Sequence, residues 1–259
     1  MQKFGIAEKN IFDVTGKVVI VTGAGTGLGE GYAQAFGEMG ATVVCAGRTQ
    51  STLERAAAAI RKNGGEAIGL SVDVTDPDAI RHFMKQVQAQ AGGVDVLVNT
   101  AGAEIVEDFL SVTPEHFDAI IGVNLKGAYF MAQAAAEAMK EKGGKIINIG
   151  SLGSYIGLAE SSVYCSSKGA IVQLTKTMAI ELAKYNIQVN AIAPGYFVTP
   201  MTQQFYDDPD HRAWIESRIP AGRWGTGEDL AGPALFLASS ASDYVTGQVV
   251  IVDGGWLAG

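Results

Sequence analysis

The chain has 259 residues, of which 47% are hydrophobic, and it carries 33 glycines and a formal net charge of −8. This length is enough for one sizeable buried core, and an α/β sheet of this length is commonly a single domain. The negative charge argues against binding to nucleic acid or to an anionic membrane surface. Cys45 and Cys165 form neither a disulfide framework nor a zinc-ligand spacing. Because no apolar run has the length of a membrane span or a signal peptide, we expect a cytoplasmic protein.

Strand and helix patterns alternate along the chain after a short lead-in over residues 1–16. Apolar strands are expected at residues 17–22, 41–46, 66–72, 94–98, 145–149, 187–192 and 248–252. Helices are expected after a glycine turn at 23–29, at 51–62, at 78–91, from Thr113-Pro114 onward, at about 162–184, and after a capping box that begins at Thr226. This alternation predicts an α/β fold: a single domain over residues 1–259 with a doubly wound, Rossmann-like parallel sheet and helices on both faces.

The glycine turn follows the first expected strand and opens a helix. Gly23, Gly27 and Gly29 would let the backbone turn tightly and let a pyrophosphate approach the N–H groups at the helix N-terminus. The spacing is not G-x-G-x-x-G, because Leu28 stands where the last glycine would fall. An ordinary glycine-rich turn is the alternative, but the strand–turn–helix context favours a dinucleotide site.

The end of the second expected strand bears on the choice of cofactor. A fold that prefers NAD usually places an acid about 20 residues beyond the glycines, where it binds the ribose hydroxyls. Here Gly47 holds that position and Arg48 follows, although Thr26 adds no second basic residue. An arginine pairs with a 2′-phosphate, so NADP(H) is the favoured cofactor and NAD(H) the alternative.

Ser151, Tyr164 and Lys168 form the strongest candidate catalytic group. Tyr164 and Lys168 are four residues apart, which places both side chains on one face of a helix. A neighbouring ammonium lowers the pKa of a phenol, so Tyr164 can exchange a proton with an alcohol oxygen that Ser151 holds. A surface helical pair is the alternative reading of Tyr164 and Lys168, and Ser151 after an expected strand, together with the upstream glycine turn, disfavours it.

Two other mechanisms find little support in the sequence. The three histidines, His82, His116 and His211, are widely spaced and form no H-E-x-x-H motif, so we expect no metal site. The segment around Ser151 is not G-x-S-x-G, because Ile149 stands where the first glycine should be, and this disfavours a serine hydrolase.

These ordered motifs resemble the short-chain dehydrogenase/reductase family over almost the whole chain, including the glycine spacing. Within that family, the last third of the chain is most similar to the gluconate 5-dehydrogenases and the 2-dehydro-3-deoxy-D-gluconate 5-dehydrogenases. The segments that carry this second resemblance are residues 187–190, 193–197, 221–225 and 252–257.

The resemblance implies roles for further residues. Asn124 would distort its helix and hold a water in the proton relay, and Lys168 would also bind the nicotinamide ribose. Asp73 would contact the adenine amino group, although a turn acid that caps the next helix is the alternative. Thr100 replaces the family's second asparagine after Asn99, and we expect little consequence from this change. The implied cofactor-binding residues are Gly23, Thr26, Gly27, Leu28, Gly29, Arg48, Asp73, Val74, Asn99, Ala101, Gly102, Tyr164, Lys168, Pro194, Gly195, Val198 and Thr199.

By the same resemblance, the substrate loop runs over about residues 196–224. Arg212, Arg218 and Arg223 lie there among aromatic residues, which suits a sugar acid such as gluconate or 5-ketogluconate; solvated arginines outside an apolar lid are the alternative. Glu104 would sit poorly beside a substrate carboxylate, so a broad carbonyl reductase or a 3-oxoacyl thioester reductase stays open. A nucleotide-binding regulator without turnover is a further alternative. The family implies a homotetramer, with residues 253–257 at a contact between subunits.

Overall fold

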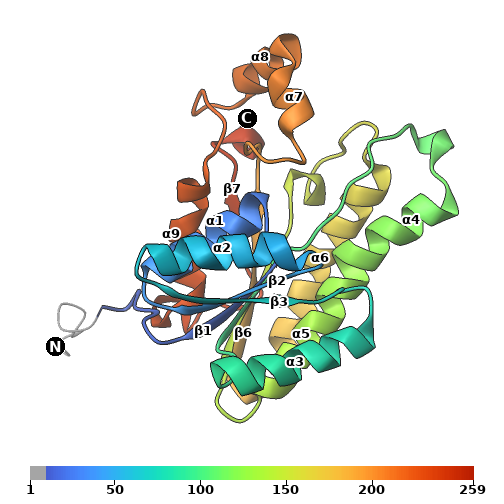
Figure 1. The fold of residues 1–259 in the computed structure, drawn as a ribbon. Helices are drawn as coiled ribbons and strands as arrows, with labels where there is room; N and C mark the ends of the chain where they lie inside the picture. The colour runs from blue at the N-terminus through green and yellow to red at the C-terminus, as the bar shows by residue number, and fades with distance from the viewer. Residues whose placement is uncertain (1–9) are drawn as a thin grey trace.

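A seven-stranded parallel sheet forms the centre of the protein, whose computed structural model describes residues 10–259 (Figure 1). The expected lead-in falls partly on residues 1–9, outside this range. The strand order is β3-β2-β1-β4-β5-β6-β7, and every neighbouring pair is parallel. The strands are β1 (Val18–Thr22), β2 (Thr42–Gly47), β3 (Glu66–Ser71), β4 (Val96–Asn99), β5 (Gly144–Ile149), β6 (Ile187–Pro194) and β7 (Val249–Val252). The order reverses between β1 and β4, and ligands of doubly wound sheets bind at such a switch point.

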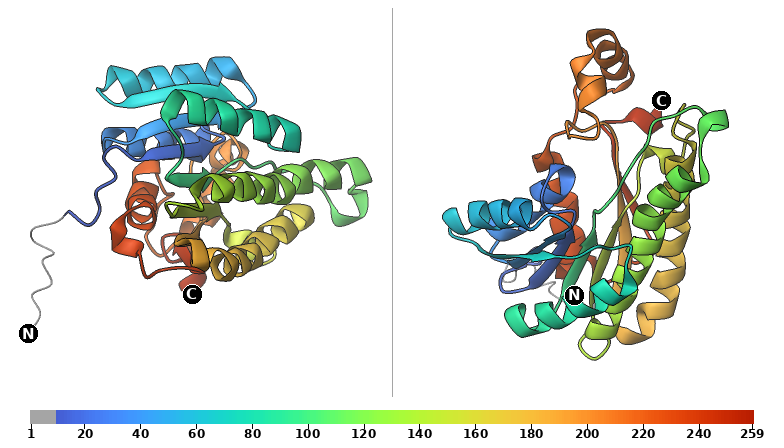
Figure 2. Two further views of the ribbon diagram at one scale, coloured as in Figure 1. Left: turned by 90° about the horizontal axis from the view of Figure 1, so that it is seen from below. Right: turned by 45° about the vertical axis from the view of Figure 1, so that its right-hand side comes forward.

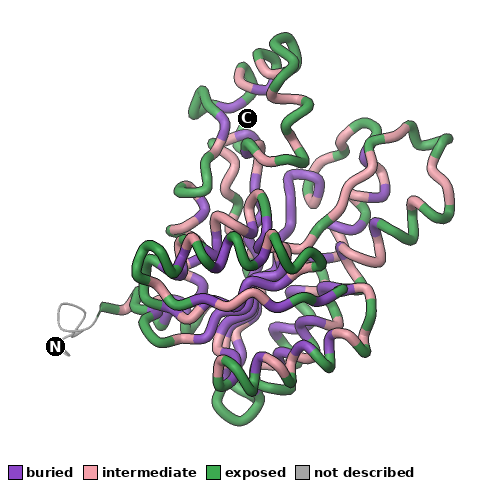
Figure 3. The backbone as a smooth tube through the Cα atoms, viewed as in Figure 1, coloured by how far each residue is buried: buried purple, intermediate pink, exposed green. Residues whose placement is uncertain are grey.

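Helices cover both faces of the sheet, as the sequence predicts (Figures 1 and 2). Alternate residues of β1 point to opposite faces: Val19 and Val21 join one core and Ile20 joins the other. The first core packs under α1 (Gly27–Glu38), α2 (Gln50–Lys62) and α9 (Gly227–Ala238). The second packs under α3 (Pro77–Ala91), α5 (Ala128–Met139) and α6 (Ser162–Leu182). Figure 3 shows the buried backbone running along the strands between these layers.

The expected helical run after Thr113 consists of α4 (Pro114–Ile121), a π-helical turn η3 (Gly122–Gly127) and α5. Thr113 begins it as predicted, since its hydroxyl accepts a hydrogen bond from the backbone N–H of His116 at 3.2 Å. The π-helical turn contains Asn124, and such turns occur frequently at functional sites. The last helix begins with the predicted cap at Thr226, whose backbone N–H donates to the Asp229 carboxylate at 2.8 Å.

The segment expected to be the substrate loop extends beyond the carboxyl ends of the strands and contains two short helices (Figure 1). They are α7 (Gln203–Asp207) and α8 (Pro209–Arg218). The Asp208 carboxylate caps α8 by accepting hydrogen bonds from the N–H groups of Asp210 and His211, at 3.0 and 3.1 Å. The Asp-Pro pair is a recognisable start signal for a helix, although we expected only a loop here.

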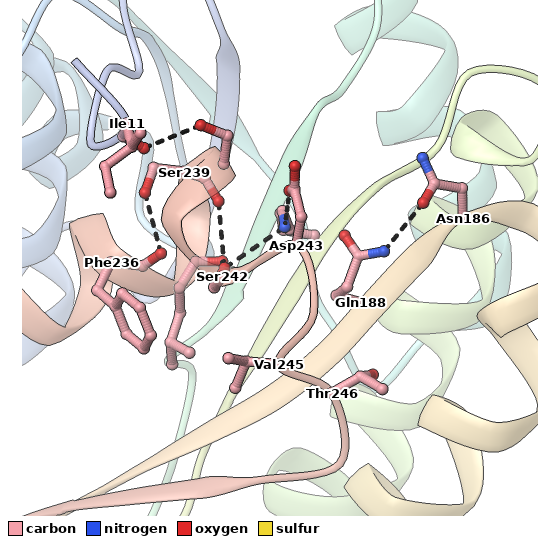
Figure 4. A network of polar contacts seen from close by, with 12 residues as sticks. Ile11, Asn186, Gln188, Phe236, Ser239, Ser242, Asp243, Val245 and Thr246 are labelled. Atoms are coloured by element: carbon pink, nitrogen blue, oxygen red, sulfur yellow. Dashed lines mark hydrogen bonds and ion pairs between the residues drawn. The ribbon is translucent and has the colours of Figure 1, made fainter. Parts of the chain in front are cut away.

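A polar network stabilises the end of the sheet that lies opposite the carboxyl ends of the strands (Figure 4). Lys145 is 6% exposed at the start of β5, and its ammonium contacts Asp243 at 2.7 Å and Ser242 at 3.4 Å. The Ser242 hydroxyl also donates to the carbonyl of Leu237 at 3.1 Å, which ties the end of α9 to the sheet. A buried lysine is costly unless it is paired, so this network fixes β5, whose other end leads to Ser151.

No helix over residues 10–259 has both the length and the apolar composition needed to cross a bilayer.

Candidate active site

The glycine turn borders a cavity of about 220 Å³ at the carboxyl ends of the central strands. Gly23 and Gly27 have φ of +69° and +58°, a left-handed conformation that favours glycine. At Gly29, a Cβ atom would lie 2.3 Å from the carbonyl oxygen of Gly23. The turn therefore needs these glycines, and it leaves the N-terminus of α1 open toward the cavity, as a pyrophosphate requires.

Thr100 provides a second sign that this cavity fits a polar cofactor. Its hydroxyl is buried and has no hydrogen-bond partner within residues 10–259, yet the residue lines the cavity. Leaving a buried hydroxyl unpaired is unfavourable, so a bound molecule with polar groups would satisfy it. The structure places Thr100 in the cavity wall, and the small consequence expected from this change stays a prediction. The signal in the sequence was its departure from the family pattern.

Most residues predicted to bind the cofactor line this cavity. They are Gly23, Thr26, Gly27, Leu28, Gly29, Ala101, Gly102, Tyr164, Lys168, Pro194, Gly195 and Thr199. The cavity wall also holds residues that we did not predict as cofactor contacts, namely Thr100, Ile149, Gly150, Phe197, Pro200, Met201 and Thr202. These residues gather because the ends of β1, β4, β5 and β6 meet at one edge of the sheet.

Arg48 and Asp73 lie beyond this wall, after the ends of β2 and β3, and both are exposed. Asp73 accepts hydrogen bonds from the N–H and hydroxyl of Thr75 at 2.9 and 2.8 Å, and these bonds lower the pKa of its carboxyl. The charge of Arg48 lowers that pKa further, so the two side chains are electrostatic neighbours. Helix α3 is capped by Asp76, whose carboxylate accepts from the N–H of Asp78 at 2.8 Å, so Asp73 is not its cap.

Asn99, Val74 and Val198 also stay outside the cavity wall. The Asn99 amide is buried and donates to the carbonyl of Ala128 at 3.0 Å and to the Asn148 side chain at 3.1 Å. Asn99 therefore joins β4, β5 and the start of α5, and its role is structural. Val74 is buried, whereas Val198 is 46% exposed near the start of the substrate loop.

The catalytic candidates come together from β5 and α6. Ser151 follows β5, and Tyr164 and Lys168 lie on the first turns of α6. The Lys168 ammonium lies 5.6 Å from the centre of the Tyr164 ring and donates to the carbonyl of Ile149 at 2.8 Å. The Ser154 hydroxyl bridges the two elements by donating to the carbonyl of Lys168 at 2.8 Å and accepting from the N–H of Ser151 at 3.2 Å. Strand β5 and helix α6 thus hold the side chains of Ser151, Tyr164 and Lys168 close together.

Burial shifts the pKa values of both Tyr164 and Lys168. Burial raises the pKa of Tyr164, a hydrogen bond with Ser151 opposes the rise, and the charge of Glu104 adds to it. Burial likewise lowers the pKa of Lys168 to about 8, which weakens the positive charge that we expected to lower the phenol's pKa. Burial thus dominates the pKa of Tyr164, and the lowering of that pKa by Lys168 stays a prediction.

Asn124 lies behind this group, in the π-helical turn. It is 2% exposed, and its side-chain oxygen accepts from the N–H of Ala103 at 2.7 Å. Its amide nitrogen donates to the carbonyl of Ala103 at 2.9 Å and to the Ser167 hydroxyl at 3.0 Å. Asn124 therefore joins the loop after β4 to α6, next to Lys168. The oxygen and the nitrogen of its buried amide both have hydrogen-bond partners.

A second cavity, of about 330 Å³, lies between the catalytic group and the substrate loop. It shares five wall residues with the first cavity: Ser151, Tyr164, Gly195, Met201 and Thr202. Tyr196, Phe205, Trp214 and Trp256 give it an aromatic side. Trp256 is 5% exposed and packs on Tyr196 at 5.0 Å between ring centres, so it adds little surface to any contact between subunits.

The three arginines of the substrate loop have different surroundings. Arg223 pairs with both oxygens of Asp229 at 2.7 and 2.8 Å, and Arg212 pairs with Glu216 at 2.8 Å. Arg218 lines the second cavity, where its guanidinium stacks over Trp256 at 4.8 Å and Trp214 at 5.3 Å. No carboxylate of the described chain pairs with Arg218, so its hydrogen-bond donors are available to a ligand.

The arrangement defines a dinucleotide-dependent oxidoreductase: a phosphate-binding glycine turn, then a serine and a tyrosine on the wall between a cofactor-sized cavity and a substrate cavity. Comparison with known proteins agrees. The model of a family described as enoyl-(acyl carrier protein) reductase matches residues 23–257. The chain belongs to the short-chain dehydrogenase/reductase family, as its motifs predicted.

Three relatives illustrate this membership. The 2-dehydro-3-deoxy-D-gluconate 5-dehydrogenase of Dickeya dadantii is 43% identical over 253 residues, which cover 96% of this chain and 98% of the relative. The structure of a gluconate 5-dehydrogenase from Burkholderia cenocepacia, in complex with NADP and tartrate, superposes with a TM-score of 0.93 at 37% identity and covers 96% of this chain and 98% of that one. A structure from Agrobacterium tumefaciens with bound NADP has a TM-score of 0.90 at 42% identity and covers 97% of this chain and 100% of that one.

Proposed function

We propose that this protein is an NADP(H)-dependent oxidoreductase that interconverts a secondary alcohol and a ketone on a sugar acid of the gluconate and 5-ketogluconate type. One observation carries the proposal: Ser151 and Tyr164 form part of both cavity walls. A substrate in the larger cavity would thus meet these two side chains where it meets the cofactor. The bound nicotinamide supplies or accepts the hydride.

The protein's own residues handle the oxygen and its proton. The Ser151 hydroxyl donates a hydrogen bond to the substrate oxygen and stabilises the charge that develops there during reduction. Tyr164 gives its phenolic proton to that oxygen during reduction and removes it during oxidation. Lys168 holds the cofactor ribose and adds a positive charge when protonated, and Asn124 fixes the loop beside it.

The cofactor preference rests on Arg48, which follows β2 and has no acid before it at Gly47. Its guanidinium would pair with the 2′-phosphate, and the NADP in two related structures agrees with this choice. NAD(H) is the alternative, and the remaining predicted cofactor contacts, Asp73, Val74, Asn99 and Val198, belong to the same proposal.

A sugar acid is the proposed substrate because Arg218 offers unpaired guanidinium donors inside the substrate cavity. The relatives are named for gluconate derivatives, and the hydroxylated diacid tartrate accompanies NADP in one of them. The aromatic side of the cavity favours a second candidate, a carbonyl reductase for apolar ketones or 3-oxoacyl thioesters.

We further propose one domain over residues 1–259, a cytoplasmic location and a homotetramer. The edge strand β7 supports the tetramer, since Ile251 there is 41% exposed. On the outer helices, Tyr129 of α5 and Ile180 of α6 are 44% and 79% exposed. Such apolar surface favours contacts with further copies of the chain. Light scattering of the purified protein would give the mass of the assembly.

A substrate panel tests the function. We would follow the loss of reduced-nicotinamide absorbance with NADPH and with NADH, against 5-keto-D-gluconate, acetoacetyl thioester and aryl ketones. Turnover of the keto sugar acid with the higher kcat/KM for NADPH is expected. Turnover of the apolar ketones alone would refute the sugar-acid assignment and support the second candidate.

A further inference from the structure

Glu104 is an acidic side chain in the substrate cavity that the proposed reaction does not use. It lines the same wall as Ser151 and Tyr164, and its carboxylate accepts a hydrogen bond from the Ser161 hydroxyl at 2.7 Å. Ser161 is 6% exposed and precedes Tyr164 by three residues, at the N-terminus of α6. Partly buried carboxylates are uncommon without a task, so its position in a ligand cavity needs an explanation.

The backbone holds Glu104 firmly at this place. The preceding residue, Ala103, has both its N–H and its carbonyl bonded to the Asn124 amide, at 2.7 and 2.9 Å. Asn124 itself bonds to Ser167 of α6 at 3.0 Å. Glu104 is thus anchored to α6 on two sides, through Asn124 and through Ser161, and α6 also carries Tyr164. The carboxylate therefore keeps a fixed position relative to the catalytic phenol.

The cavity wall holds two acids, Glu104 and Glu160, and Glu104 is the one that acts on the catalytic phenol. The charge of Glu104 contributes to the raised pKa of Tyr164. The phenol of Tyr196 is influenced by two charges, with Glu104 raising and Arg218 lowering its pKa. Arg218 lines the same cavity as Tyr196 and stacks on Trp214 and Trp256.

We propose that Glu104 is a specificity-determining residue, which accepts a hydrogen bond from a hydroxyl group next to the reacting carbonyl and repels a carboxylate at that place. This inference rests on the proposed function for the identity of the reacting end. A sugar acid would then bind with its carboxylate toward Arg218 and a hydroxyl-bearing carbon toward Glu104. Glu104 and Arg218 together select which carbonyl of a keto acid reaches Ser151 and Tyr164.

Burial raises the pKa of Glu104, and the hydrogen bond from Ser161 and the charge of Lys168 oppose the rise. These two contacts favour the ionised form that repels an anion. Replacing the acid by glutamine keeps the shape and a hydrogen-bond acceptor but removes the charge. Glu104→Gln therefore tests the effect of the negative charge without changing how the side chain packs.

The test compares 2-oxobutyrate with its ethyl ester, two substrates that differ in the charge next to the reacting carbonyl. For the wild-type protein with NADPH, we expect the ester to have the higher kcat/KM. In Glu104→Gln, the ratio of kcat/KM for the acid to that for the ester should rise about tenfold, which is about 1.4 kcal/mol. The matched control is Glu115→Gln, which removes an exposed acid from the first turn of α4 and should leave the ratio unchanged.

The binding constant for NADPH and the unfolding temperature show whether each variant is folded. If Glu104→Gln does not fold, Glu104→Met removes the same charge at similar size and should raise the ratio in the same direction. An unchanged ratio in the folded variant overturns the proposal. Turnover of 5-keto-D-gluconate by the same wild-type preparation tests the proposed function separately, since the acid-to-ester ratio needs no sugar acid.

Discussion

Replacing Asn124 by alanine removes the side chain that joins the loop after β4 to α6. Three hydrogen bonds are lost, at 2.7, 2.9 and 3.0 Å, from a side chain that is 2% exposed. At a net value of about 1 kcal/mol for each hydrogen bond, we expect the free energy of unfolding to fall by about 3 kcal/mol. For a chain of this size, that lowers the unfolding temperature by roughly 6–12 °C.

Urea unfolding followed by circular dichroism measures this loss. Asn63→Ala is the matched control, because Asn63 is exposed at the end of α2 and should change stability by no more than about 0.5 kcal/mol. A loss below about 1 kcal/mol in Asn124→Ala would contradict this expectation, since it would mean that water or a rearranged π-helical turn satisfies the freed groups of Ala103.

Three further predictions concern charge. In steady-state assays, Arg218→Gln should raise the KM for 5-keto-D-gluconate by about tenfold or more and leave the KM for an uncharged ketone unchanged. An equal rise in both KM values would contradict a contact between Arg218 and the substrate carboxylate. Arg48→Ala should raise the KM for NADPH by about tenfold and spare NADH, whereas an unaltered NADPH KM would remove the basis for the cofactor preference. Burial lowers the pKa of Lys168 from 10.5 to about 8, so between these values the unfolded chain binds more protons and stability should rise with pH. Buried Cys45 and Tyr32 have raised pKa values and act in the opposite direction, so the test is the difference between two proteins. Across this range, urea unfolding should show the stability of the wild type increasing relative to that of Lys168→Met, and parallel curves would contradict the assigned burial.

The sequence predicts the fold well because local patterns and tertiary structure agree. Each apolar run expected as a strand lies in the sheet within one or two residues, and the starts at Thr113 and Thr226 are where the capping patterns put them. The substrate loop was harder to predict. Helices α7 and α8 are short, and α8 depends on the Asp208 cap within a stretch that otherwise lacks a clear period.

The candidate site was predictable where spacing alone brings residues together. Tyr164 and Lys168 share a helix face, and Ser151 follows the neighbouring strand. The pKa of Tyr164 was not predictable, because it depends on desolvation by residues distant in the sequence. The same is true of the arginines: only the structure shows that Arg223 is paired with Asp229 while Arg218 faces the substrate cavity.

In the proposed reaction, Tyr164 transfers the proton while a hydride passes between a bound nicotinamide and a carbonyl group. The most direct test measures kcat for 5-keto-D-gluconate with NADPH in the wild type and in Tyr164→Phe, together with the binding constant for NADPH. We expect kcat to fall at least about a hundredfold while NADPH binding changes little, because only the proton donor is lost. Turnover retained in Tyr164→Phe would contradict this expectation, since the hydroxyl of this residue would then take no part in the chemistry.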